Sequence, residues 1–197
     1  MSLKGQVLLA TKNTYKFNEF KRLLPQLNLI FLNDLLDDEE FVEDKVTYLE
    51  NALSKAQFYA KKYNLITLAD DSGLEVESLN YAPGVYSARY SNQGDEKNNL
   101  KVLKELKNSS NRKAQFKCFL VLYFPNDNYF YFQGALKGYI AYKVYPGSGF
   151  VYEQIFIPEN QTKTLSLLGD EYKMMHSHRF KATEALKEFL NENFNHI

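Results

Sequence analysis

Two adjacent aspartates stand where a predicted buried strand gives way to polar residues. Residues 69–73 read ADDSG and directly follow the apolar run 65–68. A carboxylate at such a place needs a cation or hydrogen-bond donors. Magnesium takes oxygen ligands and commonly uses one or two carboxylates together with substrate phosphates. Asp70 and Asp71 are therefore candidates for a magnesium site, although a turn-capping aspartate beside an Asp–Lys ion pair explains them equally well.

The second metal carboxylate is predicted to be Glu43 rather than Glu50. Thr47 and Glu50 have the spacing of a capping box, which gives Glu50 a structural role at the start of a helix. Glu43 lies in the acidic loop before that helix, where the alternative is a simple solvated loop. Lys55 lies one turn after Asn51 on the same helix face, so it either points a cation into the site or is exposed.

The segment 11–16, TKNTYK, leaves one predicted strand and opens a predicted helix. Such a segment points backbone N–H groups and the positive end of the helix dipole at a bound anion. Lys12, Asn13 and Lys16 add cationic and amide donors that suit a phosphate. The glycines of a Walker loop are missing, and a solvated lysine-rich turn is an equally good interpretation.

Polar residues also precede the last predicted helix. His176 and His178 are two positions apart, but zinc is disfavoured because no further His or Cys lies nearby in the sequence. Ser177, His178 and Arg179 suit hydrogen bonding to a polar ring or a phosphate. The alternative is that the three residues merely cap the helix.

The elements that must position these residues alternate between strands and helices. Hydrophobic periodicity predicts the following order: a strand at 6–11, a helix interrupted by Pro25, a helix at 47–63, strands at 65–69 and 74–79 separated by the ADDSG break, a helix at 96–107, two strands at 114–124 and 129–144, and a helix at 180–194 capped by Ser177. The two long strands flank a Pro-Asn-Asp-Asn turn and predict an antiparallel hairpin. We expect a mixed α/β fold in one domain, residues 1–197, with two lobes beside a cleft.

Composition limits the classes of function. The 197 residues are 45% hydrophobic, and no run reaches the roughly 18 apolar residues that a membrane span needs. The N-terminus does not resemble a signal peptide, so a cytoplasmic location is predicted. With 24 basic and 24 acidic residues, the net charge of zero disfavours nucleic acid and anionic membranes as partners. The single cysteine, Cys118, excludes an intrachain disulfide and is predicted to pack in a strand.

The motifs together resemble the inosine/xanthosine triphosphate pyrophosphatase family over nearly the whole chain. The segments that carry the resemblance occur in the family's order: LLATKNTYKFNEF, TYLENALSKA, LADDSGLEVESLNYAPGVYSARY, GSGFVYEQIF and KMMHSHRFKA. The resemblance implies a two-lobed α/β fold with a long mixed sheet, a homodimer and a magnesium-dependent hydrolase. The implied reaction converts ITP, dITP or XTP to the monophosphate and pyrophosphate.

The resemblance also implies roles for individual residues. Magnesium would be held by Glu43 and Asp71, and Asp71 would also orient or deprotonate the attacking water, with support from Asp70. The triphosphate would be bound by the segment Thr11, Lys12, Asn13, Thr14, Tyr15 and Lys16, with added charge from Lys55. The remaining substrate contacts would come from Ser72, Phe150, Val151, Tyr152, Glu153, Lys173, His178 and Arg179. Phe150 would stack on the base, and the last three residues would read its oxo groups.

Two motifs depart from the family pattern. The phosphate loop of the family usually reads Thr-Gly-Asn, whereas this chain has Lys12 in the glycine position and Tyr15 in a small-residue position. The base segment usually reads Phe-Gly-Tyr-Asp-Pro, whereas residues 150–154 read FVYEQ. These changes leave two alternatives: the same chemistry on a different nucleotide, or a catalytically silent nucleotide-binding protein. The presence of the metal carboxylates and phosphate lysines argues against the second.

Overall fold

The computed structural model describes residues 5–35, 39, 41–147 and 149–194. One sheet contains six strands in the order β2-β1-β3-β4-β5-β6, which are β1 (Gln6–Leu9), β2 (Asn28–Phe31), β3 (Ile66–Val76), β4 (Lys113–Tyr123), β5 (Tyr129–Ile140) and β6 (Phe156–Pro158). β1 pairs in parallel with β2 and β3, whereas β5 and β6 are antiparallel. The predicted mixed α/β class is therefore confirmed, as is the β4–β5 hairpin.

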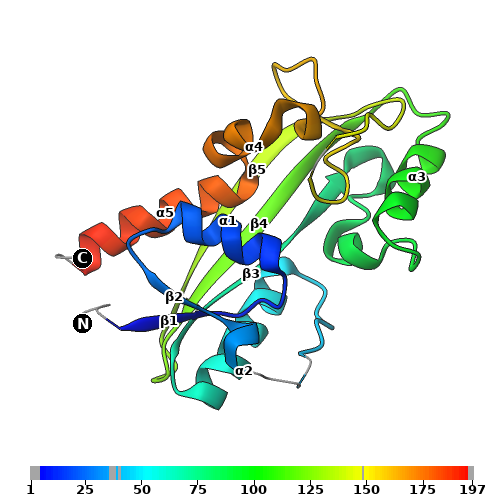
Figure 1. Ribbon diagram of the computed structural model, residues 1–197. Coiled ribbons are helices and arrows are strands. Elements are labelled where there is room, and N and C mark those ends of the chain that lie inside the picture. The colour runs from blue at the N-terminus through cyan, green and yellow to red at the C-terminus, as the bar shows by residue number, and fades with distance from the viewer. Residues whose placement is uncertain (1–4, 36–38, 40, 148, 195–197) are drawn as a thin grey trace. The chain divides into compact units, whose positions relative to one another are not determined.

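Three helices connect strands, and two more follow β6 at the end of the described chain (Figure 1). They are α1 (Thr14–Leu23), α2 (Tyr48–Tyr63), α3 (Asp95–Glu105), α4 (Leu165–His176) and α5 (His178–Asn193), with 3₁₀ turns η1 (Leu32–Leu35), η2 (Glu77–Leu79) and η3 (Gly84–Arg89). α1 ends before Pro25, as predicted, because proline cannot donate the next helical hydrogen bond. None of the described helices is both long and apolar enough to cross a membrane.

The chain divides into two compact units, and β3, β4 and β5 contribute residues to both. Unit 1 comprises 1–71, 118–133 and 181–197, and unit 2 comprises 72–117 and 134–180. The boundary in β3 falls between Asp71 and Ser72, in the middle of the ADDSG stretch.

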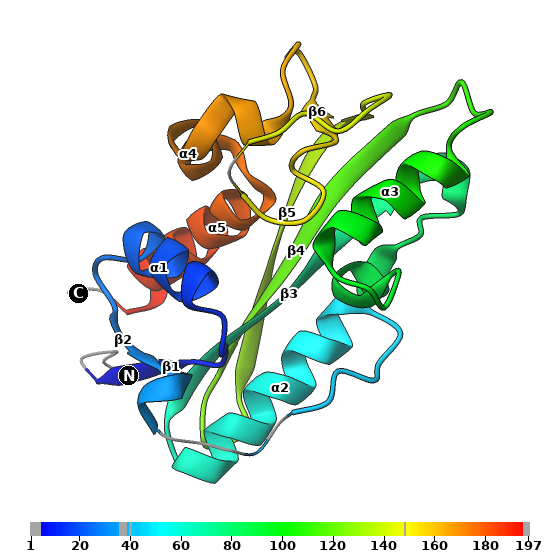
Figure 2. The same cartoon turned by 45° about the vertical axis from the view of Figure 1, so that its right-hand side comes forward.

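Unit 1 buries apolar side chains on both faces of its strands. Alternation in β1 sends Val7 and Leu9 to one face, where they pack with α1 and α5, and sends Leu8 to the other, where it packs with the Ala52–Ala56–Ala60 face of α2. Figures 1 and 2 show α1 and α5 on one side of β1 and α2 on the other. This three-layer arrangement fixes the carboxyl ends of β1 and the first half of β3 relative to the start of α1.

Unit 2 has its own core between the second half of β3, β4, β5 and the helices α3 and α4. Its fully buried members include Leu74, Val102, Leu106, Tyr152 and Phe156. α3 and α4 lie on opposite sides of these strands (Figure 2). The loop that follows β5 is therefore anchored in the core through Tyr152.

One local prediction is wrong. The sequence predicted two strands separated by a break at ADDSG, but β3 runs without interruption from Ile66 to Val76. The polar side chains of this stretch all find partners, described below, so the backbone continues its ladder. The sequence also gave no prediction for β2, β6 or α4.

Candidate active site

The phosphate-loop segment forms the N-terminus of α1. Asn13 is the N-cap residue, and its side-chain oxygen accepts hydrogen bonds from the backbone N–H groups of Tyr15 at 2.9 Å and Lys16 at 3.1 Å. The hydroxyl of Thr11 accepts a hydrogen bond from the Asn13 N–H group at 3.2 Å. This geometry makes the segment rigid by local hydrogen bonds and leaves the positive end of the α1 dipole at the end of β1.

The side chains of this segment divide into two groups. Lys16 reaches the Asp70 carboxylate, with a distance of 3.0 Å between Nζ and Oδ2. Lys12 instead donates to the backbone carbonyl of Glu39 at 3.1 Å. Thr14 begins the helix and is exposed, and Tyr15 is 77% exposed. Lys16 thus places its cation against a predicted carboxylate, whereas Lys12 binds a loop carbonyl.

α2 brings a second cation and an amide to the same place. Lys55 donates to the backbone carbonyl of Asp70 at 2.7 Å and forms an ion pair with Glu43. Asn51, one turn earlier, donates to the Asp71 carboxylate at 2.9 Å and is completely buried. The sequence predicted that Lys55 could face the site and missed Asn51 as a partner of Asp71.

The helix α2 begins where the capping residue predicts. Thr47 is the N-cap and accepts a hydrogen bond from the Glu50 N–H group at 3.2 Å, while its hydroxyl donates to the Glu50 carboxylate at 2.8 Å. Glu50 thus has a structural role at the start of α2, through the Thr47 hydroxyl. The cap fixes the register of α2, which places Asn51 and Lys55 on the face that meets β3.

The electrostatics of this cluster leave Asp71 poorly stabilised as an anion. Burial, followed by the negative charge of Glu43, raises the pKa of Asp71 to about 6, against the opposing effects of Lys55, Asn51 and Lys16. Burial lowers the pKa of Lys55, but the charges of Glu43, Asp70 and Asp71 outweigh it and raise the pKa above its ordinary value. A cation near Asp71 and Glu43 would remove the repulsion between the two carboxylates.

The donor set fits magnesium only as a partial site. Among the described residues, no group of three or more His, Cys, Asp or Glu side chains is placed to hold a metal ion. The negative charge of Glu43 repels that of Asp71. If these two carboxylates held a magnesium ion, phosphate oxygens would have to complete its coordination. That is the arrangement expected where the ion arrives with a nucleotide.

A second group of predicted residues lies in unit 2. Arg179 is 5% exposed, donates to the Ser72 hydroxyl at 3.2 Å and lies over the Phe150 ring at 5.8 Å. The ring of His178 stacks on Phe116, with centroids 5.0 Å apart and planes 14° apart. Ser177 accepts a hydrogen bond from the Phe180 N–H group at 3.0 Å, as predicted for the cap of α5.

The base segment places a buried carboxylate against a lysine. Glu153 is 5% exposed, and its Oε2 lies 3.1 Å from Nζ of Lys173, which also contacts Asp170 at 2.8 Å. Burial lowers the pKa of Lys173, but the two carboxylates outweigh it and raise the pKa. Gly149 permits this approach, because a Cβ there would come within 1.9 Å of Oε2 of Glu153. The sequence analysis did not identify Asp170 as a partner of Lys173.

Known proteins are similar to this chain over most of its length. The Ham1 family model matches residues 7–189. The dITP/XTP pyrophosphatase of Acholeplasma laidlawii is 40% identical over 185 residues, covering 93% of this chain and 91% of that protein. The dITP/XTP pyrophosphatase of Staphylococcus aureus strain MW2 is 39% identical over 187 residues, covering 94% and 96%.

Solved structures of Ham1 proteins share the fold of this chain. The Staphylococcus aureus Ham1 protein superposes with a TM-score of 0.88 at 38% identity, covering 95% of this chain and 99% of that one. A HAM1 protein from Coxiella burnetii superposes with a TM-score of 0.87 at 36% identity, covering 95% and 98%. The sequence match and the shared fold extend over both units. The chain therefore belongs to the Ham1 family.

Proposed function

We propose that this chain is a magnesium-dependent pyrophosphatase that converts ITP, dITP and XTP to the monophosphate and pyrophosphate. The observation that carries the proposal is the unit 1 cluster, in which two lysines and a buried amide contact three carboxylates, two in β3 and one in the loop before α2. Relatives of similar length are named dITP/XTP pyrophosphatase, which supports the choice of substrates.

In this proposal the triphosphate is bound by Lys16, Lys55 and the N-terminus of α1. Glu43 and Asp71 would hold magnesium, which would supply positive charge that offsets the phosphates. Asp71 would also orient the attacking water and accept its proton, acting as a general base. Asn51 keeps the Asp71 carboxylate in one orientation during this transfer.

The residues of unit 2 bind the base. Phe150 offers a ring face, and Lys173 and Arg179 offer donors that suit the oxo groups of hypoxanthine and xanthine. Lys173 is already shared by Glu153 and Asp170, so a base must compete with or add to those contacts. Adenine presents an amino donor at the position of the 6-oxo acceptor, so cationic donors disfavour it.

The altered base segment supports one alternative. Val151 packs against the unit 2 core, and Gln154 donates to the Gly147 carbonyl at 3.1 Å. These contacts belong to the residues that differ from the family pattern, so the same hydrolysis could act on another nucleotide. A homodimer and a cytoplasmic location are also proposed from the family resemblance. Light scattering would distinguish a dimer from the 23.0 kDa monomer.

The test is pyrophosphate release from ITP, dITP, XTP, ATP, GTP, dUTP and CTP, with magnesium and with EDTA. Asp71→Asn serves as the control for contaminating phosphatases. Preference for ITP, dITP and XTP that requires magnesium supports the proposal. Preference for another nucleotide supports the alternative substrate. The same low release of pyrophosphate by wild type and Asp71→Asn would overturn the proposal that the chain is an enzyme.

A further inference from the structure

The base segment contains a residue in a costly backbone conformation. Tyr152 has φ of +71°, in the left-handed region that non-glycine residues adopt only when their surroundings enforce it. Its side chain is 1% exposed and packs in the unit 2 core. This conformation sets the path of the backbone on both sides of Tyr152, toward Val151 and toward Glu153.

Two hydrogen bonds hold Tyr152 in place. Its backbone N–H group donates to the side-chain oxygen of Asn99 at 2.8 Å. Its hydroxyl donates to the backbone carbonyl of Ser87 at 2.8 Å. Both ends of the residue are therefore tied to parts of unit 2 that lie more than fifty positions earlier in the chain.

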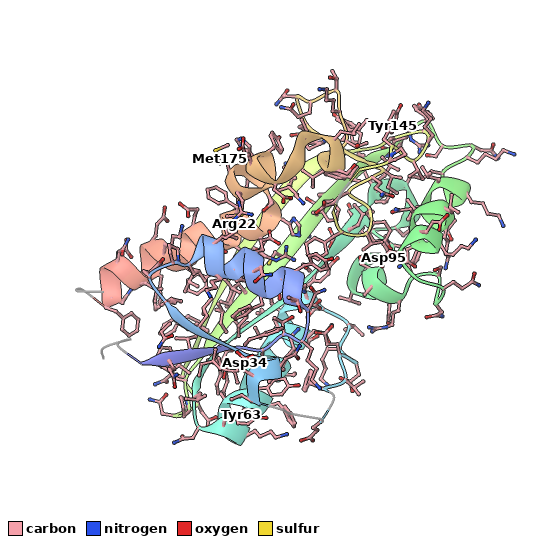
Figure 3. All side chains as sticks on the ribbon, in the orientation of Figure 1. Arg22, Asp34, Tyr63, Asp95, Tyr145 and Met175 are labelled. Carbon is pink, nitrogen blue, oxygen red and sulfur yellow. The ribbon has the colours of Figure 1, made fainter. Side chains whose placement is uncertain are left out.

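Asn99 comes from α3, the helix whose first residue, Asp95, is labelled in Figure 3. It is 3% exposed, and its amide also approaches the side-chain oxygen of Gln154 at 3.5 Å. One buried side chain thus contacts the segment on both sides of Glu153. Burying a polar side chain costs free energy unless its polar atoms form hydrogen bonds. The hydrogen bonds to segment 150–154 therefore account for an asparagine at this buried position.

The adjacent residue, Asn98, fixes the other support of Tyr152. Its side-chain oxygen accepts from the Ser91 N–H group at 2.6 Å, and its amide donates to the carbonyls of Ser87 at 3.3 Å and Ala88 at 3.2 Å. The Ser87 hydroxyl in turn accepts from the N–H group of Leu74 in β3 at 2.9 Å. The network therefore connects β3, η3, α3 and the base segment within one unit.

We propose that Asn99 is a positioning residue for base recognition, which fixes the backbone of segment 150–154 at Tyr152 so that Phe150 and Glu153 are presented to the base. This inference rests on the proposed function, because it assigns that segment to the base. Asn99 itself contacts no substrate in this proposal. It acts on the segment through Tyr152 and Gln154.

The first experiment reports on the segment without catalysis. The chain has no tryptophan, so Phe150→Trp introduces a single fluorescent reporter whose quenching by acrylamide measures how well the segment is ordered. Adding Asn99→Ala should increase quenching. The matched control is Val102→Ala, which removes buried methyl groups from the same helix, lowers thermal stability and should leave quenching unchanged.

The second experiment uses the chain with Phe150 intact. Asn99→Ala should raise the KM for ITP on the order of tenfold, the effect expected from one buried hydrogen bond, with a smaller change in kcat. Inhibition by inorganic triphosphate, which has no base, should remain within about twofold of wild type. Asn99→Asp retains an acceptor for the Tyr152 N–H group and should restore most of the KM.

Three outcomes would overturn the inference: unchanged quenching in Asn99→Ala, a parallel loss of ITP and inorganic triphosphate binding, or equal effects from Val102→Ala. Each would make Asn99 a purely structural residue. Failure of the wild-type chain to hydrolyse any triphosphate would instead overturn the proposed function. The quenching comparison would still decide whether Asn99 fixes the segment.

Discussion

Asp71 is 6% exposed, and burial, followed by the charge of Glu43, makes its ionised carboxylate unfavourable in the folded protein and so raises its pKa. The folded state holds this proton more tightly than the unfolded chain does. The contribution of Asp71 to stability is therefore fully present below its ordinary pKa of 3.8 and is lost as the pH rises through about 6. Above that pH, the site retains a charge that its protein surroundings do not fully offset.

We expect Asp71→Asn to stabilise the metal-free protein while it abolishes hydrolysis. One pKa unit corresponds to about 1.4 kcal/mol, so the change in pKa from 3.8 to about 6 costs the folded state on the order of 3 kcal/mol at pH 8. Asparagine has no charge and keeps an oxygen that can accept from Asn51. The expected gain at pH 8 is about 1–3 kcal/mol, falling below about 1 kcal/mol at pH 4.

Urea denaturation in EDTA at pH 4 and pH 8 measures the difference in unfolding free energy. Asp34→Asn, at an exposed aspartate in η1, is the control for removing one negative charge. Magnesium with a non-hydrolysable triphosphate should stabilise wild type more than Asp71→Asn, because ligands stabilise the state that binds them. The reasoning fails if the variant is less stable than wild type at pH 8 in EDTA, or if its gain does not shrink at pH 4.

Three further substitutions test the remaining contacts. Lys55→Met leaves Glu43 without its buried cation. We expect the free energy of unfolding in urea to fall by about 3 kcal/mol and kcat/KM to fall at least about 100-fold. A variant as stable as wild type would contradict this. Asn51→Ala removes a hydrogen bond that lowers the pKa of Asp71, so the acid limb of the pH–rate profile should move to higher pH, and a move to lower pH would refute the assignment. Lys173→Met leaves the Glu153 carboxylate without its lysine, so the KM for ITP should rise about tenfold and the ratio of kcat/KM for ITP over ATP should fall; an unchanged ratio would exclude Lys173 from base recognition.

The sequence predicted those features that depend on neighbours in the chain. Thr47 and Glu50 are three positions apart, so the cap of α2 could be read directly, and so could the end of α1 before Pro25. The hairpin was evident because both strands alternate around a short turn of polar residues. In each case the physical cause lies within a few residues of its effect.

The features that were missed depend on distant partners. Asn51 contacts Asp71 across 20 positions, and Asn99 contacts Tyr152 across 53. The ADDSG stretch reads as a break because its polar residues disfavour a buried strand. The break does not occur, since Lys16, Asn51 and Arg179 supply the missing hydrogen bonds from elsewhere in the chain. Such compensation has no local signal, because any of many lysines, asparagines or arginines could have provided it.

The two groups of proposed site residues differ in the balance of their positive and negative charges. This difference predicts that each group depends on different conditions for binding its part of a nucleotide. In unit 1, three carboxylates, Glu43, Asp70 and Asp71, contact two lysines and a buried amide. Burial, and then the charge of Glu43, keep the pKa of Asp71 raised despite the lysines. A divalent cation bound there, as proposed above, would reverse the sign of the net charge and make the cluster attractive to a polyphosphate.

In unit 2, Lys173 is already held between Glu153 and Asp170, so its charge is compensated before any ligand arrives. If the base binds there as proposed, it would gain little long-range attraction and would instead depend on short, well-oriented contacts with groups that are fixed in advance. Phosphate binding should therefore depend strongly on magnesium and ionic strength, whereas base selectivity should depend on the rigidity of segment 150–154. That is why a buried asparagine with no substrate contact, Asn99, is expected to change selectivity.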